Sequence, residues 1–226
     1  SDNSGNIIRA LFVDFAKALD LVDHNVLMQK MIDYDFPPQV TSWSLSFLQD
    51  REQFVKINNC LSSVTRINSG CPQGTLSGPN NFKLLINDLR FRLSYIKYVD
   101  DTSVVSVSND PNDNSLQLSL NELADWCTAN AMRSNTVKTK EMVVCFGKQF
   151  DVSRLQILAI NGSMIERVSC FKLLGVYFNC DLTWQNHVDY ILKKVSKRIY
   201  FMYLLMSMPK ARTDLRKYFL APDLLK

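Results

Sequence analysis

Three aspartates stand at positions where a sheet would bring them together. Asp14 ends an apolar, β-branched run, and Asp100 and Asp101 separate two β-rich stretches that read as a hairpin. If these elements are neighbours in one sheet, three carboxylates meet at one edge. Carboxylates held together in a half-buried site repel each other, and a bound divalent cation removes that repulsion. Two Mg²⁺ ions about 4 Å apart, or Mn²⁺ in their place, would then support an in-line displacement at phosphorus.

The same acids also fit a purely structural interpretation. Asp14 would cap a following helix, and Asp100 with Asp101 would fill a turn. Asp20 and Asp23 are expected to mark the start of a helix rather than to bind metal. The acids alone leave both interpretations open.

The hydrophobic periodicity predicts an α+β fold in which an antiparallel sheet packs on helices. Hairpins are expected from alternating segments and from the turn residues Asn161-Gly162. The predicted strands are 7–15, 53–57, 63–67, 95–99, 102–107, 141–146, 155–160, 164–168 and 171–178. The predicted helices lie around 26–32, 38–47, 82–89, 116–131 and 184–205.

Five short segments resemble motifs A to E of reverse transcriptases, in the family's order. They are LFVDFAKALD at 11–20, PQGTLSGP at 72–79, YVDD at 98–101, Asn135 with KTK at 138–140, and FKLLGV at 171–176. Val22-Asp23-His24 continues the first motif as LINE-type elements do. The resemblance covers nearly the whole chain and points to LINE-type (non-LTR), jockey-like retrotransposons.

This resemblance implies a polymerase palm with an antiparallel sheet packed on helices, followed by a partial helical thumb, with most of the fingers missing. The expected divisions are palm with motif A at 1–27, a fingers-like insertion at 28–70, palm with motifs B to E at 71–179, and the start of the thumb at 180–226.

The resemblance also assigns catalytic roles. Asp14 and Asp100 would hold the two metal ions, and Asp101 would support them. Lys138 would be the general acid for the departing pyrophosphate. Catalysis would then rest on positioning and metal electrostatics, with little covalent help from the protein.

Four positions are expected to contact the substrate. The Phe15 carbonyl would be a further metal ligand, and Gln73 would contact template and incoming nucleotide. Gly74 would let backbone approach the base pair. Leu19 falls where an aromatic side chain usually lies beneath the sugar, which puts discrimination against ribonucleotides in doubt.

Nucleic acid is expected to bind through motif E and the basic tail. From Asp181 onward the chain has nine Lys or Arg against four Asp. Positive charge concentrated on a helical segment suits a phosphate-binding face, although a solvated amphipathic helix is an alternative. The residues expected to contact nucleic acid are Lys172, Gly175, Lys193, Lys194, Lys197 and Arg198.

The resemblance implies an RNA-directed DNA polymerase domain that extends a DNA primer on an RNA template with deoxynucleoside triphosphates. An endonuclease domain is expected in the parent protein. The alternative is an inactive or co-opted remnant that binds nucleic acid or a protein, because the fingers segment preceding motif A is missing. A two-metal nuclease is a third interpretation, but it would not need the Pro72-Gln73-Gly74 loop or a primer grip.

Composition agrees with an intracellular chain, in the nucleus or the cytoplasm. The six cysteines form no C-x-x-C pair, so reduced thiols are expected rather than zinc or disulfides. Apolar runs are too short for a membrane span. The polar N-terminus shows no signal peptide and no initiator Met, so we expect a piece of a longer protein.

Overall fold

A computed structural model describes residues 7–146 and 151–207 of the chain. The chain forms two compact units, residues 1–169 and residues 170–226. No helix in the described part is both long enough and apolar enough to cross a membrane.

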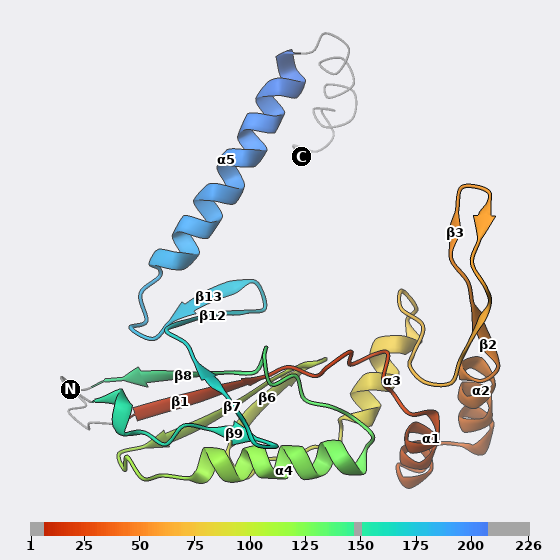
Figure 1. The fold of residues 1–226 in the computed structure, drawn as a ribbon, viewed down its shortest axis with the longest axis horizontal. Helices are drawn as coiled ribbons and strands as arrows, with labels where there is room; N and C mark the ends of the chain where they lie inside the picture. The colour runs from red at the N-terminus through yellow and green to blue at the C-terminus, as the bar shows by residue number, and fades with distance from the viewer. Residues whose placement is uncertain (1–6, 147–150, 208–226) are drawn as a thin grey trace, which may run out of the picture. The chain divides into compact units, whose positions relative to one another are not determined.

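The first unit is built on a five-stranded sheet in the order β11-β8-β1-β7-β6. Its central strand β1 pairs antiparallel with β7 on one side and β8 on the other, while β11 joins β8 in parallel (Figure 1). The strands are β1 (Ile7–Val13), β6 (Ser94–Tyr98), β7 (Asp101–Ser108), β8 (Lys140–Cys145) and β11 (Glu166–Arg167). The predicted antiparallel sheet is confirmed, and with it the α+β class.

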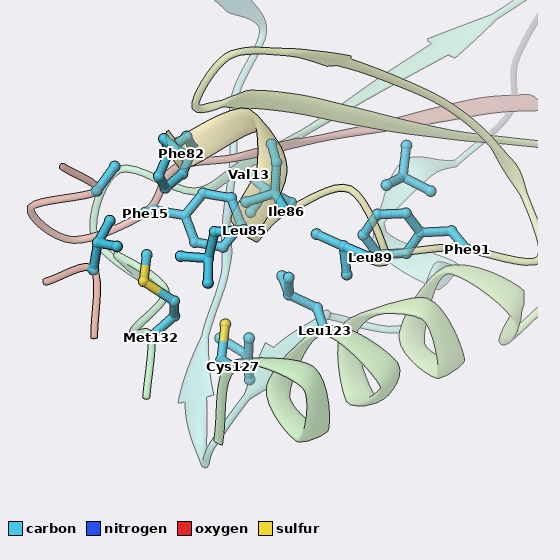
Figure 2. Packing of buried hydrophobic residues seen from close by; sticks show 14 of the residues in the cluster. Val13, Phe15, Phe82, Leu85, Ile86, Leu89, Phe91, Leu123, Cys127 and Met132 are labelled. Atoms are coloured by element: carbon cyan, nitrogen blue, oxygen red, sulfur yellow. The ribbon is translucent and has the colours of Figure 1, made fainter. Parts of the chain in front are cut away.

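Four α-helices among the described residues complete the first unit. They are α1 (His24–Asp33), α2 (Pro38–Leu48), α3 (Ser77–Leu85) and α4 (Ser115–Ala129). Helix α4 packs against β7 of the sheet, while α1 packs on α2 and α3. On α4 the buried residues Leu116, Leu120, Leu123 and Cys127 recur at helical spacing, so one stripe faces the core. Figure 2 shows Leu123 and Cys127 of α4 converging with α3 residues and with Phe15 in one apolar cluster.

A long hairpin connects α2 to the loop before α3. Its stem pairs β2 (Arg51–Gln53) with β5 (Thr65–Ile67), and its tip pairs β3 (Lys56–Ile57) with β4 (Cys60–Leu61). The hairpin predicted for this segment is confirmed.

The strand predicted over residues 155–160 is mostly wrong. Only β9 (Ala159–Ile160) is strand, and it pairs with β10 (Ser163–Met164) around the Asn161-Gly162 turn, as predicted. The preceding chain holds a short 3₁₀ turn, Val152–Arg154. The Gln156 carbonyl accepts a hydrogen bond from the Arg9 guanidinium at 2.9 Å instead of a strand partner. The apolar pattern there reflects burial of side chains rather than strand pairing.

A buried ionic cluster ties three strands of the sheet together. Glu141 on β8, with a side chain 1% exposed, accepts hydrogen bonds from Arg9 on β1 at 2.7 Å and from Arg167 on β11 at 2.8 Å. The Arg9 side chain is itself only 4% exposed. The carboxylate is thus paired on both oxygens, as a buried charge requires.

The second unit contains β12 (Cys170–Leu173), β13 (Val176–Asn179) and α5 (Gln185–Ser207). The single strand predicted over 171–178 is wrong, because β12 and β13 form a hairpin. Leu174 and Gly175 both have positive φ, 47° and 88°, which is the backbone of a two-residue hairpin turn. The long predicted helix is confirmed.

The two units divide at Ser169–Cys170, before the motif E segment, whereas the sequence boundary was expected near 179–181. The proposed palm, fingers and thumb limits stay predictions.

Candidate active site

The end of β1 and the start of β7 bring predicted catalytic acids side by side. Val13 pairs with Thr102 at the end of the β1–β7 ladder, so Asp14 directly follows the ladder on one strand and Asp101 directly precedes it on the other. The charge of Asp14 acts on Asp101, which agrees with this proximity. Asp100 lies in the turn between β6 and β7, next to Asp101.

Burial and charge both act on these carboxylates. The pKa of Asp101 is raised, first by burial and then by the negative charges of Asp100 and Asp14. One carboxylate oxygen of Asp14, Oδ1, is buried and accepts no hydrogen bond. A divalent cation would bind the unpaired Asp14 oxygen, and its positive charge would offset the repulsion between the carboxylates.

The carboxylates do not stand as a preformed metal group. Among the described residues, no three His, Cys, Asp or Glu side chains are arranged to hold a metal ion. The acids therefore fit a divalent cation by chemistry and by strand register, but metal binding by Asp14, Asp100 and Asp101 stays a prediction.

Lys138 lies beside the first of these acids. Its Nζ is 3.8 Å from Asp14 Oδ2, with the lysine side chain 68% exposed. The loop that carries it is fastened to Asp14: the Asn135 amide donates to the Asp14 carbonyl at 2.8 Å, and the Asp14 amide donates to Thr139 Oγ1 at 3.2 Å. This loop positions Lys138 near the acids without burying its charge.

The segment after Asp14 is anchored in the core. The ring of Phe15 is buried and packs edge-on against Phe82 at a centroid distance of 6.0 Å (Figure 2). It packs in the same way against Trp126 at 6.1 Å. The Leu19 side chain is half-buried against the same cluster, and its carbonyl accepts the Cys71 amide at 2.8 Å. Both side chains thus fix the path of the backbone, while the substrate contacts expected at Phe15 and Leu19 stay predictions.

The motif B loop lies open beside the same segment. Gln73 is exposed, and its side-chain amide donates to Asp20 Oδ1 at 3.0 Å. Gly74 has φ +78°, and a Cβ added to it would meet no atom within 4 Å, so backbone there is accessible. Thr75 closes the loop by donating to the Pro72 carbonyl at 2.8 Å.

The structure gives Asp20 a role that the sequence missed. Asp23 caps α1 as predicted, accepting the Asn25 and Val26 amides at 2.8 and 3.0 Å. Asp20 does not cap the helix. It holds Gln73 instead, and this contact spans 53 residues of chain, so no local pattern could have revealed it.

In the second unit, aromatic rings surround Lys172. Its ammonium donates to the Tyr190 hydroxyl at 3.3 Å and lies 4.4 Å from that ring's centroid and 5.4 Å from that of Tyr177. The pKa of Tyr190 is lowered by this hydrogen bond and by the charges of Lys172 and Lys194. Gly175 forms the tip of the same hairpin.

The predicted basic face is present on α5. Lys193 and Lys197 are four residues apart, as are Lys194 and Arg198, so the four cations lie on neighbouring rows of one helix surface. All four are exposed. Contact with nucleic acid at these positions and at Lys172 and Gly175 stays a prediction.

Comparison with known proteins defines the class of this chain. The family described as Reverse transcriptase (RNA-dependent DNA polymerase) matches residues 2–178. The chain belongs to the reverse transcriptase family.

Its relatives are polymerases of mobile elements. The chain is 28% identical over 203 residues to the "Probable RNA-directed DNA polymerase from transposon BS" of Drosophila melanogaster, covering 84% of this chain and 22% of that protein. It is 27% identical over 192 residues to the "RNA-directed DNA polymerase from mobile element jockey" of the same fly, covering 80% of this chain and 20% of that protein. The expected resemblance to LINE-type, jockey-like reverse transcriptases is confirmed. The chain spans about a fifth of the length of these relatives.

Proposed function

We propose that this chain is the catalytic core of an RNA-directed DNA polymerase that adds deoxynucleotides to a DNA primer on an RNA template. The observation that carries the proposal is that Asp14 and Asp101 meet at the end of the β1–β7 ladder, with a buried Asp14 oxygen that has no hydrogen-bond partner. The assignment of the first unit to a palm with a fingers-like insertion, and of α5 to the start of a thumb, belongs to this proposal.

Asp14 and Asp100 would hold two Mg²⁺ ions, or Mn²⁺ in their place, with Asp101 beside them. The ions would supply activation of the primer 3′-hydroxyl and charge stabilisation of the leaving pyrophosphate. Lys138, 3.8 Å from Asp14 Oδ2, would deliver a proton to that pyrophosphate. Gln73, steadied by Asp20, would meet the template and the incoming nucleotide.

The proposal is tested by primer extension on an RNA template with Mg²⁺. The proteins compared are this chain, a version extended by its natural upstream residues, and Asp100→Asn in both. The matched control is Asp125→Asn, an exposed acid on α4. We expect Asp100→Asn to lower extension by about a hundredfold or more, because it removes charge stabilisation at the reacting phosphate. Asp125→Asn should not change it.

Two results would contradict the proposal: no extension by the lengthened protein, or equal extension by its Asp100→Asn variant. A second candidate function, nucleic-acid binding without catalysis, is favoured by the lack of a preformed metal group among the described residues. Tight template–primer binding without extension would support that second function. An endonuclease domain elsewhere in the parent protein and an intracellular setting remain part of the proposal.

A further inference from the structure

A polar cleft lies between the hairpin stem and the loop that leads into motif B. Its volume is about 700 Å³, within the usual range of ligand sites. Side chains that line it include Asp20, Arg51, Gln53, Asn68 and Gln73. The predicted catalytic acids and Lys138 are not among its lining residues. The cleft is therefore separate from the proposed metal site, although Gln73 and Asp20 connect it to motif A.

The floor of the cleft is held firmly. Gly70 donates its amide to the Val22 carbonyl at 2.7 Å, and Cys71 donates to the Leu19 carbonyl at 2.8 Å. His24, a buried side chain, bonds the Gly70 carbonyl through Nε2 at 2.9 Å. A floor fixed at three points loses little conformational entropy when a ligand binds.

The stem of the hairpin forms the wall. Arg51 lies opposite Ile67 in the β2–β5 pair, and residues two apart on a strand share a face, so Gln53 points the same way. Arg66 also lines the cleft, but it comes from the other face of the stem, where its guanidinium lies 3.9 Å from Glu52. Both faces of the stem therefore contribute to the lining, and Arg51 is the lining cation that forms no ion pair with another described residue.

The polar groups of the cleft are mostly uncommitted. The side chains of Arg51, Gln53 and Asn68 make no hydrogen bond or ion pair with any other described residue. A guanidinium suits a phosphate oxygen, and side-chain amides suit base edges and the 2′-hydroxyl of RNA. This set of donors matches a nucleotide that belongs to a strand.

We infer that this cleft receives a nucleotide of the single-stranded RNA template ahead of the templating position, with Arg51 on its phosphodiester. The inference rests on the proposed function and names where its template enters. Gln53 and Asn68 contact the base or sugar of the same nucleotide.

Charge and position favour a template strand over a free nucleotide. Two arginines against Asp20 give the lining a net charge of +1, which suits one phosphodiester and not the several charges of a triphosphate. A triphosphate must also reach the metal-binding acids, and these do not line the cleft.

The test measures the affinity of the protein for primer–template duplexes in the absence of Mg²⁺, with fluorescence anisotropy as the readout. The RNA template carries a 5′ overhang of zero, one, two or four nucleotides. We expect the overhang to strengthen binding to the natural chain. Arg51→Ala should lower the overhang-dependent increase in affinity about tenfold, which is the contribution of one charge-assisted hydrogen bond. It should also reduce the slope of log affinity against log salt concentration by nearly one unit. Lys56→Ala is the matched control, because Lys56 is an exposed cation farther along the same hairpin and outside the cleft.

The variants are first checked for native circular dichroism and unfolding temperature, and Arg51→Lys should recover most of the salt slope. Equal losses of affinity in Arg51→Ala and Lys56→Ala would overturn the inference, because they would show only a general attraction between positive charge and nucleic acid. The inference would also be overturned if Arg51→Ala kept the full increase in affinity from the overhang but raised the KM for the nucleotide. That result would assign the cleft to the free nucleotide. Asp100→Asn should keep the overhang gain, so failure of catalysis and failure of this cleft are distinguishable.

Discussion

Replacing Glu141 by glutamine removes the buried negative charge that pairs with Arg9 and Arg167. Glu141 accepts from Arg9 at 2.7 Å and from Arg167 at 2.8 Å, and its side chain is 1% exposed. Arg167 is 23% exposed and can turn toward water, whereas Arg9 at 4% cannot. Glu141→Gln therefore leaves one guanidinium buried beside a neutral amide.

Loss of one partner of a buried ion pair costs about 3–5 kcal/mol of unfolding free energy. The lower end is expected here, since Arg9 keeps a hydrogen bond to the Gln156 carbonyl at 2.9 Å. A loss near 3 kcal/mol is a large share of a domain's total stability of about 5–15 kcal/mol. The effect on the fold should therefore be easy to measure.

Urea unfolding measures the change, with an unaltered slope showing that the native state stays compact. Glu166→Gln is the control, because Glu166 pairs with Lys140 at a side-chain exposure of 66% and should cost at most about 1 kcal/mol. The double variant Arg9→Met with Glu141→Leu should recover much of the loss, because it buries no unpaired charge at either position. A cost below about 1 kcal/mol for Glu141→Gln would refute this account of the cluster.

Two further outcomes follow from local geometry. Gly70→Ala should destabilise the first unit more than Gly162→Ala in the same unfolding assay. Both glycines have positive φ, but only a Cβ at position 70 would lie 2.7 Å from a backbone oxygen, that of Asp20. Equal costs would show that the packing at Gly70 can relax. Lys172→Met should raise the pKa of the Tyr190 phenol, because the hydrogen bond from Lys172 and its positive charge now lower that pKa. Ultraviolet titration of the natural and substituted chains measures the change. An unchanged titration would mean that the ammonium does not sit on that ring in solution.

Much of the fold was readable in the sequence, because several elements carry their own signals. The run from Ile7 is β-branched and apolar and forms β1, and the stripe from Leu116 to Cys127 has helical spacing and forms α4. The motif B loop was recognisable from its glycine and proline residues, and the YVDD box from its position in a hairpin. These features depend on neighbours within a few residues, so local chemistry determines them.

Other features were not readable, because they depend on where distant segments meet. The strand predicted over 171–178 is a hairpin, since a turn at Leu174-Gly175 competes with a continuous apolar run. The role of Glu141 as a buried partner of two arginines had no sequence signal, because its partners come from strands on either side of β8.

The candidate site divides in the same way. The residue types of Asp14, Asp100, Asp101 and Lys138 are sequence properties, but the acids alone left a structural interpretation open, and the resemblance to reverse-transcriptase motifs was needed to point to phosphoryl transfer. Only the tertiary structure decided that Asp14 and Asp101 meet, because the pairing that brings them together joins β1 and β7, which lie far apart in the sequence. The β2–β5 pairing likewise places Arg51 opposite Ile67, and both line the cleft. Local patterns name the residues of a site, but only pairing between separate strands determines which of them meet.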